Sequence, residues 1–219
     1  MQASQLIKDT IPPLRLSDNG ARAMLWMDIF HVDMLPVING KKYMGLITHK
    51  QLTDQVLSDA ISTYQLDFTH PYLINSQHIY QAFTFAANHN FPVIPVIDEQ
   101  HHYIGLITYA DLIAGLVEIK SLNTEGSIIV ISVRQKDYQL SHIMQIVESN
   151  DAQVLNTDVF FNTEQEIVEV TIKINRLDLT RIESAFYRHN YVIKSLYHQS
   201  QFNDELQNRY DSLMNYLNI

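Results

Sequence analysis

A threonine and a carboxylate three residues apart, Thr108 and Asp111, have types and spacing that could bind a small molecule. They lie in GLITYADL, where an apolar run ends and a helical pattern begins, so both side chains are expected on one side of the helix's first turn. The free amides of a helix start favour phosphate. A carboxylate accepts hydrogen bonds from both hydroxyls of a ribose diol. The motif therefore predicts a corner that holds a ribose and attracts phosphate.

The same spacing has a simpler interpretation. A threonine followed three residues later by an acid can cap a helix without any ligand, leaving Asp111 as a solvated acid of the first turn. Taken alone, the motif favours this capping role. Its context decides between the two, because the segment around it occurs twice.

The segment FPVIPVIDEQHHYIGLITYADL, residues 91–112, repeats VDMLPVINGKKYMGLITHKQL, residues 32–52. The offset is 59 before the turn and 60 after it, so one residue was added in the turn. Thr48 thereby aligns with Thr108, and Gln51 aligns with Asp111. Further matches upstream extend the unit to about sixty residues, which is typical of a duplicated module. A neutral amide holds a diol less well than a carboxylate does, so the first corner is expected to be empty or weak.

The sequence pattern of each unit predicts the order strand, helix, strand, strand, helix. In the first unit, Ser17 is expected to cap a helix that runs to about residue 31, and Asn39-Gly40 predicts a tight hairpin. Apolar residues four apart, from Leu52 to Tyr64, predict a long second helix from Thr48. In the second unit, the apolar strands near Leu73 and Ile94 are expected to flank the corner of Thr108 and Asp111. The predicted elements there are strands 72–74, 93–97 and 103–107 and helices 76–89 and 108–120.

These residues resemble a tandem pair of CBS domains, a Bateman module, over about residues 1–122, with units at about 1–64 and 65–122. The resemblance rests on Ala23 and Met27, on Leu35-Pro36-Val37, and on the two Gly-Leu-Ile-Thr segments with their helices. It implies an adenosine-containing ligand such as AMP, ADP, ATP, a cyclic dinucleotide or S-adenosylmethionine. The adenine ring of such a ligand is expected between the strands near Leu73 and Ile94. The candidate ligand-binding residues are Thr108, Asp111, Thr69, His70, Leu73, Ile94, Thr48 and His49.

The polar segment Asn123-Thr124-Glu125-Gly126 separates the two repeated units from a different pattern. Over residues 123–200 the expected order of elements is βαββαβ, a ferredoxin-like order. In length and position it resembles an ACT domain, and the whole chain is similar to CBS–ACT regulators, a group that includes the acetoin-utilisation-associated protein. Tyr138 stands where that family's first turn usually has a glycine, so amino-acid binding there is not expected. A C-terminal helix is predicted within 201–219. The predicted fold class is α+β.

Composition restricts the function further. The chain has 219 residues, 15 Lys and Arg, and a formal charge of −9, which argues against nucleic acid as a partner. No apolar run is long enough for a membrane span, and the start lacks the pattern of a signal peptide. There is no cysteine, so the cytoplasm is the expected compartment. Ten histidines show no ligand spacing, and no catalytic motif is present, so neither a metal site nor an enzyme is expected.

Two functions remain open. The first is a non-enzymatic sensor that binds an adenosine compound in the CBS pair. The alternative is a structural or assembly protein whose ligand sites have decayed, for which Gln51 is the supporting residue. Both are compatible with a homodimer, which the apolar helix stripes predict. The sequence identifies no protein partner.

Overall fold

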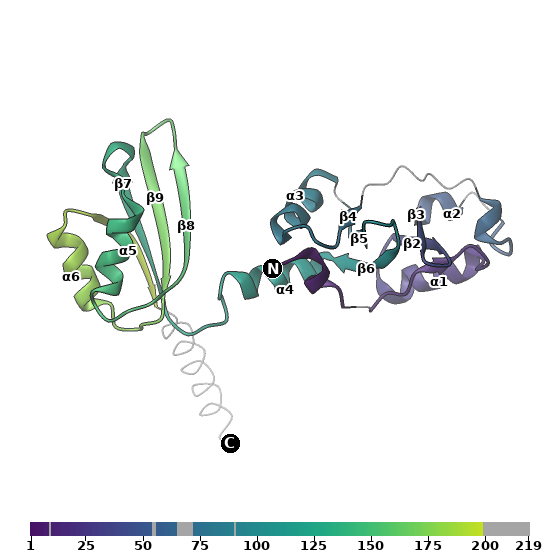
Figure 1. The fold of residues 1–219 in the computed structure, drawn as a ribbon, viewed down its shortest axis with the longest axis horizontal. Helices are drawn as coiled ribbons and strands as arrows, with labels where there is room; N and C mark the ends of the chain where they lie inside the picture. The colour runs from purple at the N-terminus through teal and green to yellow at the C-terminus, as the bar shows by residue number, and fades with distance from the viewer. Residues whose placement is uncertain (9, 54–55, 65–71, 90, 199–219) are drawn as a thin grey trace, which may run out of the picture. The chain divides into compact units, whose positions relative to one another are not determined.

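The computed structural model describes residues 1–8, 10–53, 56–64, 72–89 and 91–198. The chain divides into two compact units, Met1–Ile119 and Lys120–Ile219, each of which has its own core (Figure 1). The predicted C-terminal helix and the candidate residues Thr69 and His70 lie outside the described residues.

The first copy in unit 1 is built on a three-stranded sheet of order β1-β2-β3. β1 pairs parallel with β2, which pairs antiparallel with β3 through a tight turn where Gly40 has φ +62°. The helices pack on this sheet and bury Ala23, Met27 and Leu52. The elements are η1 (Ala3–Leu6), β1 (Leu14–Arg15), α1 (Gly20–Phe30), β2 (Met34–Asn39), β3 (Lys42–Thr48), α2 (His49–Thr53) and η2 (Ile61–Thr63).

The second copy repeats the arrangement with a sheet of order β4-β5-β6, in which β4 is parallel to β5 and β5 antiparallel to β6. Its elements are β4 (Leu73–Ile74), α3 (Ile79–His89), β5 (Val93–Ile97), β6 (Tyr103–Thr108) and α4 (Tyr109–Ile119). The predicted strand and helix order of both copies is therefore confirmed.

The two copies form one module because their hairpins and cores meet. The Tyr43 amide donates to the His101 carbonyl at 3.1 Å, and the Tyr103 amide donates to the Lys41 carbonyl at 2.8 Å. Val93 of the second copy is buried in the core of the first. The aligned rings of Tyr43 and Tyr103 stack at 6.4 Å between centroids.

Two details of the predicted first copy are wrong. α1 is capped by Asn19, whose side chain accepts from the Arg22 amide, and not by Ser17. The long second helix is absent from the described residues, because α2 ends at Thr53 and residues 56–64 turn back along the chain instead. There the Ile61 amide donates to the Asp18 carbonyl at 2.8 Å. Backbone pairing with a distant segment replaces the helical hydrogen bonds that the apolar spacing predicts.

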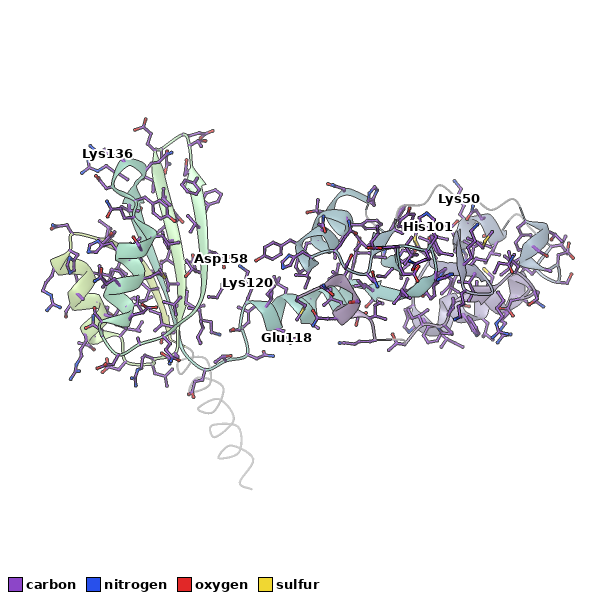
Figure 2. All side chains as sticks on the ribbon, viewed as in Figure 1. Lys50, His101, Glu118, Lys120, Lys136 and Asp158 are labelled. Carbon is purple, nitrogen blue, oxygen red and sulfur yellow. The ribbon has the colours of Figure 1, made fainter. Side chains whose placement is uncertain are left out.

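Unit 2 has the predicted βαββαβ order, and its sheet order β10-β7-β9-β8 is that of a ferredoxin-like fold. Helices α5 and α6 cover one face of the sheet and bury Ile143, Val147 and Phe186 against it (Figure 1). Lys120 forms an ion pair with Asp158 on β8 (Figure 2). The elements are β7 (Ser127–Arg134), η3 (Gln135–Asp137), α5 (Leu140–Glu148), β8 (Val154–Asn162), β9 (Ile167–Ile174), α6 (Thr180–Arg188) and β10 (Val192–His198). The α+β class is confirmed.

Candidate functional site

The corner between β6 and α4 holds Thr108 and Asp111 together. One carboxylate oxygen of Asp111, Oδ2, accepts from the Thr108 amide at 2.9 Å and from the Thr108 hydroxyl at 2.6 Å. The Asp111 amide donates back to the Thr108 hydroxyl at 3.2 Å. This reciprocal set is a capping box. The second carboxylate oxygen, Oδ1, takes no part in it.

The corner between β3 and α2 makes the same bonds with a neutral side chain. Oε1 of Gln51 accepts from the Thr48 amide at 2.8 Å and from the Thr48 hydroxyl at 3.0 Å. The Gln51 amide donates to the Thr48 hydroxyl at 3.2 Å. Capping therefore requires an oxygen at this position but no negative charge.

The two corners differ in charge. Asp111 is only 6% exposed, and an ionised carboxylate pays a desolvation cost at such a position unless it is paired. Its Oδ1 lies 3.5 Å from the ammonium of Lys8, whose side chain is 57% exposed. An exposed lysine compensates a buried carboxylate only in part, because solvent screens the pair and the lysine side chain must be ordered. The second corner thus holds a nearly buried carboxylate with one oxygen available for a further partner.

Lys8 reaches this corner because the N-terminal segment packs on the second copy. Ala3 and Leu6 are buried with the residues of α3 and α4. Leu6 lies against Gly115 of α4, where a Cβ atom would stand 2.3 Å from the leucine side chain. The sequence pattern assigned no role to Lys8, since 103 residues separate it from Asp111 and no local spacing links them.

The other candidate residues are placed as follows. Leu73 and Ile94 are 4% and 0% exposed and belong to the core of the second copy. That burial accounts for both residues without a ligand, and their contact with an adenine ring stays a prediction. His49 is exposed at the start of α2, where its amide donates to the Asp33 carbonyl. Thr69 and His70, which the sequence places before β4, are not among the described residues.

A cavity of about 250 Å³ lies between the two copies and was not predicted. Tyr43 and Met44 of β3 line it, together with Tyr72, Ile97 and His101 of the second copy (His101 is labelled in Figure 2). Burial raises the pKa of the Tyr43 hydroxyl well above its usual value. The cavity is smaller than most ligand pockets, which measure roughly 300–1,000 Å³. The sequence gives no local signal for this cavity, because its lining residues come from both copies.

Neither a metal cluster nor a membrane span is found in the part of the chain that the structure describes. There, no three His, Asp or Glu side chains gather so as to hold a metal ion. None of the helices there combines the length and the apolar character that crossing a membrane requires.

A family model described as CBS domain matches residues 75–118. The matched segment contains Thr108 and Asp111, so the predicted family is confirmed for the second copy. The first copy is related to it by the repeat and by the same order of elements.

The chain is also similar to solved CBS structures. A CBS domain pair/ACT domain protein from Thermotoga maritima is 18% identical and aligns over 54% of this chain and 98% of its own, with a TM-score of 0.48. The CBS domains of a transcriptional regulator from Streptococcus pneumoniae are 18% identical over 52% of this chain and 98% of their own, with a TM-score of 0.47. CBSX2, whose structure was solved in complex with AMP, is 16% identical over 54% of this chain and 98% of its own, with a TM-score of 0.46.

Proposed function

We propose that unit 1 is a non-enzymatic regulatory sensor that binds one adenosine-containing ligand per chain at the corner of Thr108 and Asp111. The observation that carries this proposal is the carboxylate itself. Gln51 makes the same capping bonds in the first copy, so the charge of Asp111 is not needed to begin α4. A nearly buried charge that the fold does not need is typical of a functional site.

The Asp111 oxygen that lies outside the cap, Oδ1, suits a ribose. Each carboxylate oxygen can accept two hydrogen bonds, and the cap uses both positions of Oδ2. Oδ1 therefore provides the acceptors for the hydroxyls of the diol. The hydroxyl of Thr108 already donates to Asp111, so it positions the carboxylate and does not donate to the ligand in this geometry.

The surroundings of the corner favour an anionic group attached to that ribose. α4 has 11 residues, and its amino-terminal end carries partial positive charge. Lys8 stands 3.5 Å from Oδ1, so a ribose that takes this oxygen would compete with the ammonium. The long lysine side chain can then turn to the phosphate of the same ligand. A bound nucleotide would thus replace the Asp111 carboxylate with its own phosphate as the partner of Lys8.

Adenosine is the part that AMP, ADP, ATP, cyclic dinucleotides and S-adenosylmethionine share, and the resemblance to CBS domains is what favours it. S-adenosylmethionine has a sulfonium cation in place of phosphate, so Lys8 would disfavour it. A free diol at Oδ1 also disfavours ligands whose 2′ or 3′ hydroxyls are esterified, as they are in cyclic dinucleotides. The corner therefore favours AMP, ADP or ATP.

A thermal-shift screen of these compounds tests the proposal on the full chain. A ligand at about a hundred times its Kd stabilises the folded state by about 2.7 kcal/mol, which is readily measured. The matched variant is Asp111→Gln, which copies the first corner. It should keep the melting temperature of the free protein close to that of the wild type and lose the ligand-induced shift. A shift that is unchanged in Asp111→Gln would show that the ligand binds elsewhere.

A further inference from the structure

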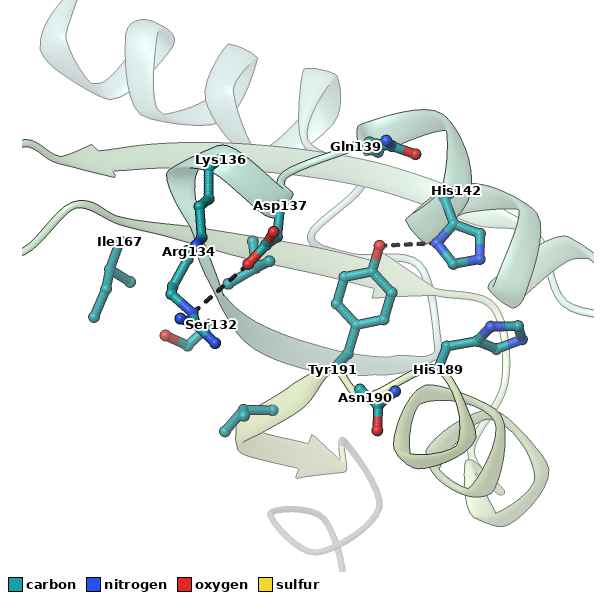
Figure 3. Close-up of a pocket in the computed structure, with 12 residues that line it drawn as sticks. Ser132, Arg134, Lys136, Asp137, Gln139, His142, Ile167, His189, Asn190 and Tyr191 are labelled. Atoms are coloured by element: carbon teal, nitrogen blue, oxygen red, sulfur yellow. Dashed lines mark hydrogen bonds and ion pairs between the residues drawn. The ribbon is translucent and has the colours of Figure 1, made fainter.

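Unit 2 contains a concave pocket of about 640 Å³ (Figure 3). Its volume lies in the range of ligand pockets, roughly 300–1,000 Å³. The pocket is bordered by the end of β7 with the turn η3, by the start of α5, and by the turn from α6 into β10. The lining residues that the structure describes all belong to unit 2, whereas the corner of Asp111 belongs to unit 1.

The pocket collects basic groups in an otherwise acidic chain. Arg134 and Lys136 line one side, and the imidazoles of His142 and His189 line the other, 4.9 Å apart between ring centroids (Figure 3). Among the described lining residues, Asp137 is the one carboxylate, and its side chain lies 3.6 Å from the guanidinium of Arg134. Two permanent cations thus face one anion, in a chain whose formal charge is −9.

The floor of the pocket is ordered by packing. Tyr191 is 7% exposed, and its ring packs on Phe186 in the core of unit 2. The Tyr191 hydroxyl and Nδ1 of His142 are 3.0 Å apart and hydrogen-bonded. This bond fixes the orientation of the His142 imidazole. Val133 and Ile167 add apolar wall to the same cavity.

The start of α5 borders the pocket at Gln139 and His142. Gln139 precedes this helix of 9 residues, and its side chain makes no capping bond. Asn190, in the turn from α6 into β10, lines the cavity as well.

We propose that this pocket binds a small dianionic molecule with an apolar part, such as a phosphate monoester or a dicarboxylate. The guanidinium of Arg134 presents paired donors that match either group, and Lys136, His142 and His189 add further donors. Val133 and Ile167 would contact the apolar part. Unit 2 is then a second sensing module, whose ligand is recognised by its two negative charges.

The charge balance selects against free amino acids. An amino acid carries an ammonium group, which the basic side chains around the pocket repel. A dianion without an ammonium group gains from the same side chains. The formal charge of −9 opposes the binding of a nucleic acid.

Calorimetric titration of the full chain with phenyl phosphate and with succinate, at fixed ionic strength, tests this assignment. Phenyl phosphate lacks a ribose, and the Asp111→Gln variant should bind it as the wild type does, which separates this site from the proposed nucleotide corner. Saturable binding of at least one of the two probes is expected, with one molecule per chain. Arg134→Gln should weaken it by about fivefold to tenfold, at the low end for hydrogen bonds to charged groups, because the Arg134 side chain is 75% exposed and solvent screens its charge.

The matched control is Arg181→Gln, which removes the same charge from α6 outside this pocket. It should change the affinity less than about threefold, since an exposed charge at a distance contributes little. His189→Gln, at an exposed position, provides a second variant if Arg134→Gln fails to fold. The absence of saturation with both probes at about 10 mM would overturn the proposal, since that limit excludes even a millimolar Kd. Equal losses in Arg134→Gln and Arg181→Gln, or glycine binding as tightly as succinate, would overturn it as well.

Discussion

At the scale of single residues, Asp111 and Gln51 form a comparison that the protein itself provides. Their backbone positions and capping bonds match, and one side chain carries a charge that the other lacks. The sequence alone could not separate capping from ligand binding at Asp111, because both use the same spacing. The structure shows that capping is present at both corners. It leaves the charge of Asp111 and its second oxygen as the features that a ligand would use.

Tyr138 is the second residue whose type matters. Its ring meets Phe161 edge to face at 5.7 Å and packs against the core of unit 2. It therefore fills the space that a glycine would leave open at the first turn of a ferredoxin-like unit. We predict that no common amino acid binds to this turn. Calorimetric titration should give only heats of dilution, and saturable binding that is lost on mutation of Lys136 or Tyr138 would contradict the prediction.

At the scale of elements, residues 56–64 show how tertiary contacts override local spacing. The segment turns back and is held partly by the hydroxyl of Tyr64, which lies 3.0 Å from the Val56 carbonyl and 3.2 Å from the Asp59 carbonyl. Gly20 gives this hydroxyl room, because a Cβ atom at Gly20 would stand 2.5 Å from it. The turn therefore depends on a residue far from it in sequence, and helical periodicity alone predicts the wrong element.

This turn gives a prediction about stability. Tyr64→Phe should lower the free energy of unfolding by about 0.5–1.5 kcal/mol, because a typical intramolecular hydrogen bond contributes that much and the carbonyls lose their donor. Urea denaturation measures the change. The control is Tyr80→Phe, in a side chain that is 53% exposed on α3, which should have little effect. Equal effects of the two substitutions would mean that the Tyr64 hydroxyl does not hold the turn.

The same distinction between local spacing and tertiary contacts decides how much of the site the sequence could predict. The two corners are predictable because each lies within one local strand-to-helix segment, and the repeat presents that segment twice. The contact between Lys8 and Asp111 is not predictable from spacing, since it depends on how the N-terminal segment packs on α4. The basic pocket of unit 2 is not predictable from spacing either, because the fold brings Arg134 and His189 together from distant parts of the sequence.

At the scale of the whole molecule, helices α1 and α4 of unit 1 expose large apolar side chains. Leu25 and Ile29, one turn apart on α1, are 56% and 57% exposed, and Ile113 on α4 is 63% exposed. Exposed apolar patches of this kind usually mark an interface. We therefore predict a homodimer.

Light scattering at micromolar concentration should give twice the chain mass of 25.4 kDa. If the interface includes α1, the double variant Leu25→Glu, Ile29→Glu should give a monomer without loss of helix, since glutamate is a good helix former. A wild-type protein that scatters as a 25.4 kDa species would refute the dimer. A double variant that stays dimeric would place the interface elsewhere.

The carboxylate of Asp111 is proposed to decide where an adenosine ligand binds. The number of ligand molecules bound per chain tests this most directly. Calorimetric titration with AMP, ADP or ATP should give one site per chain in the wild type and none in Asp111→Gln. Gln51→Asp should add a second, weaker site. Two equal sites in the wild type, or one site that Asp111→Gln retains, would contradict the account.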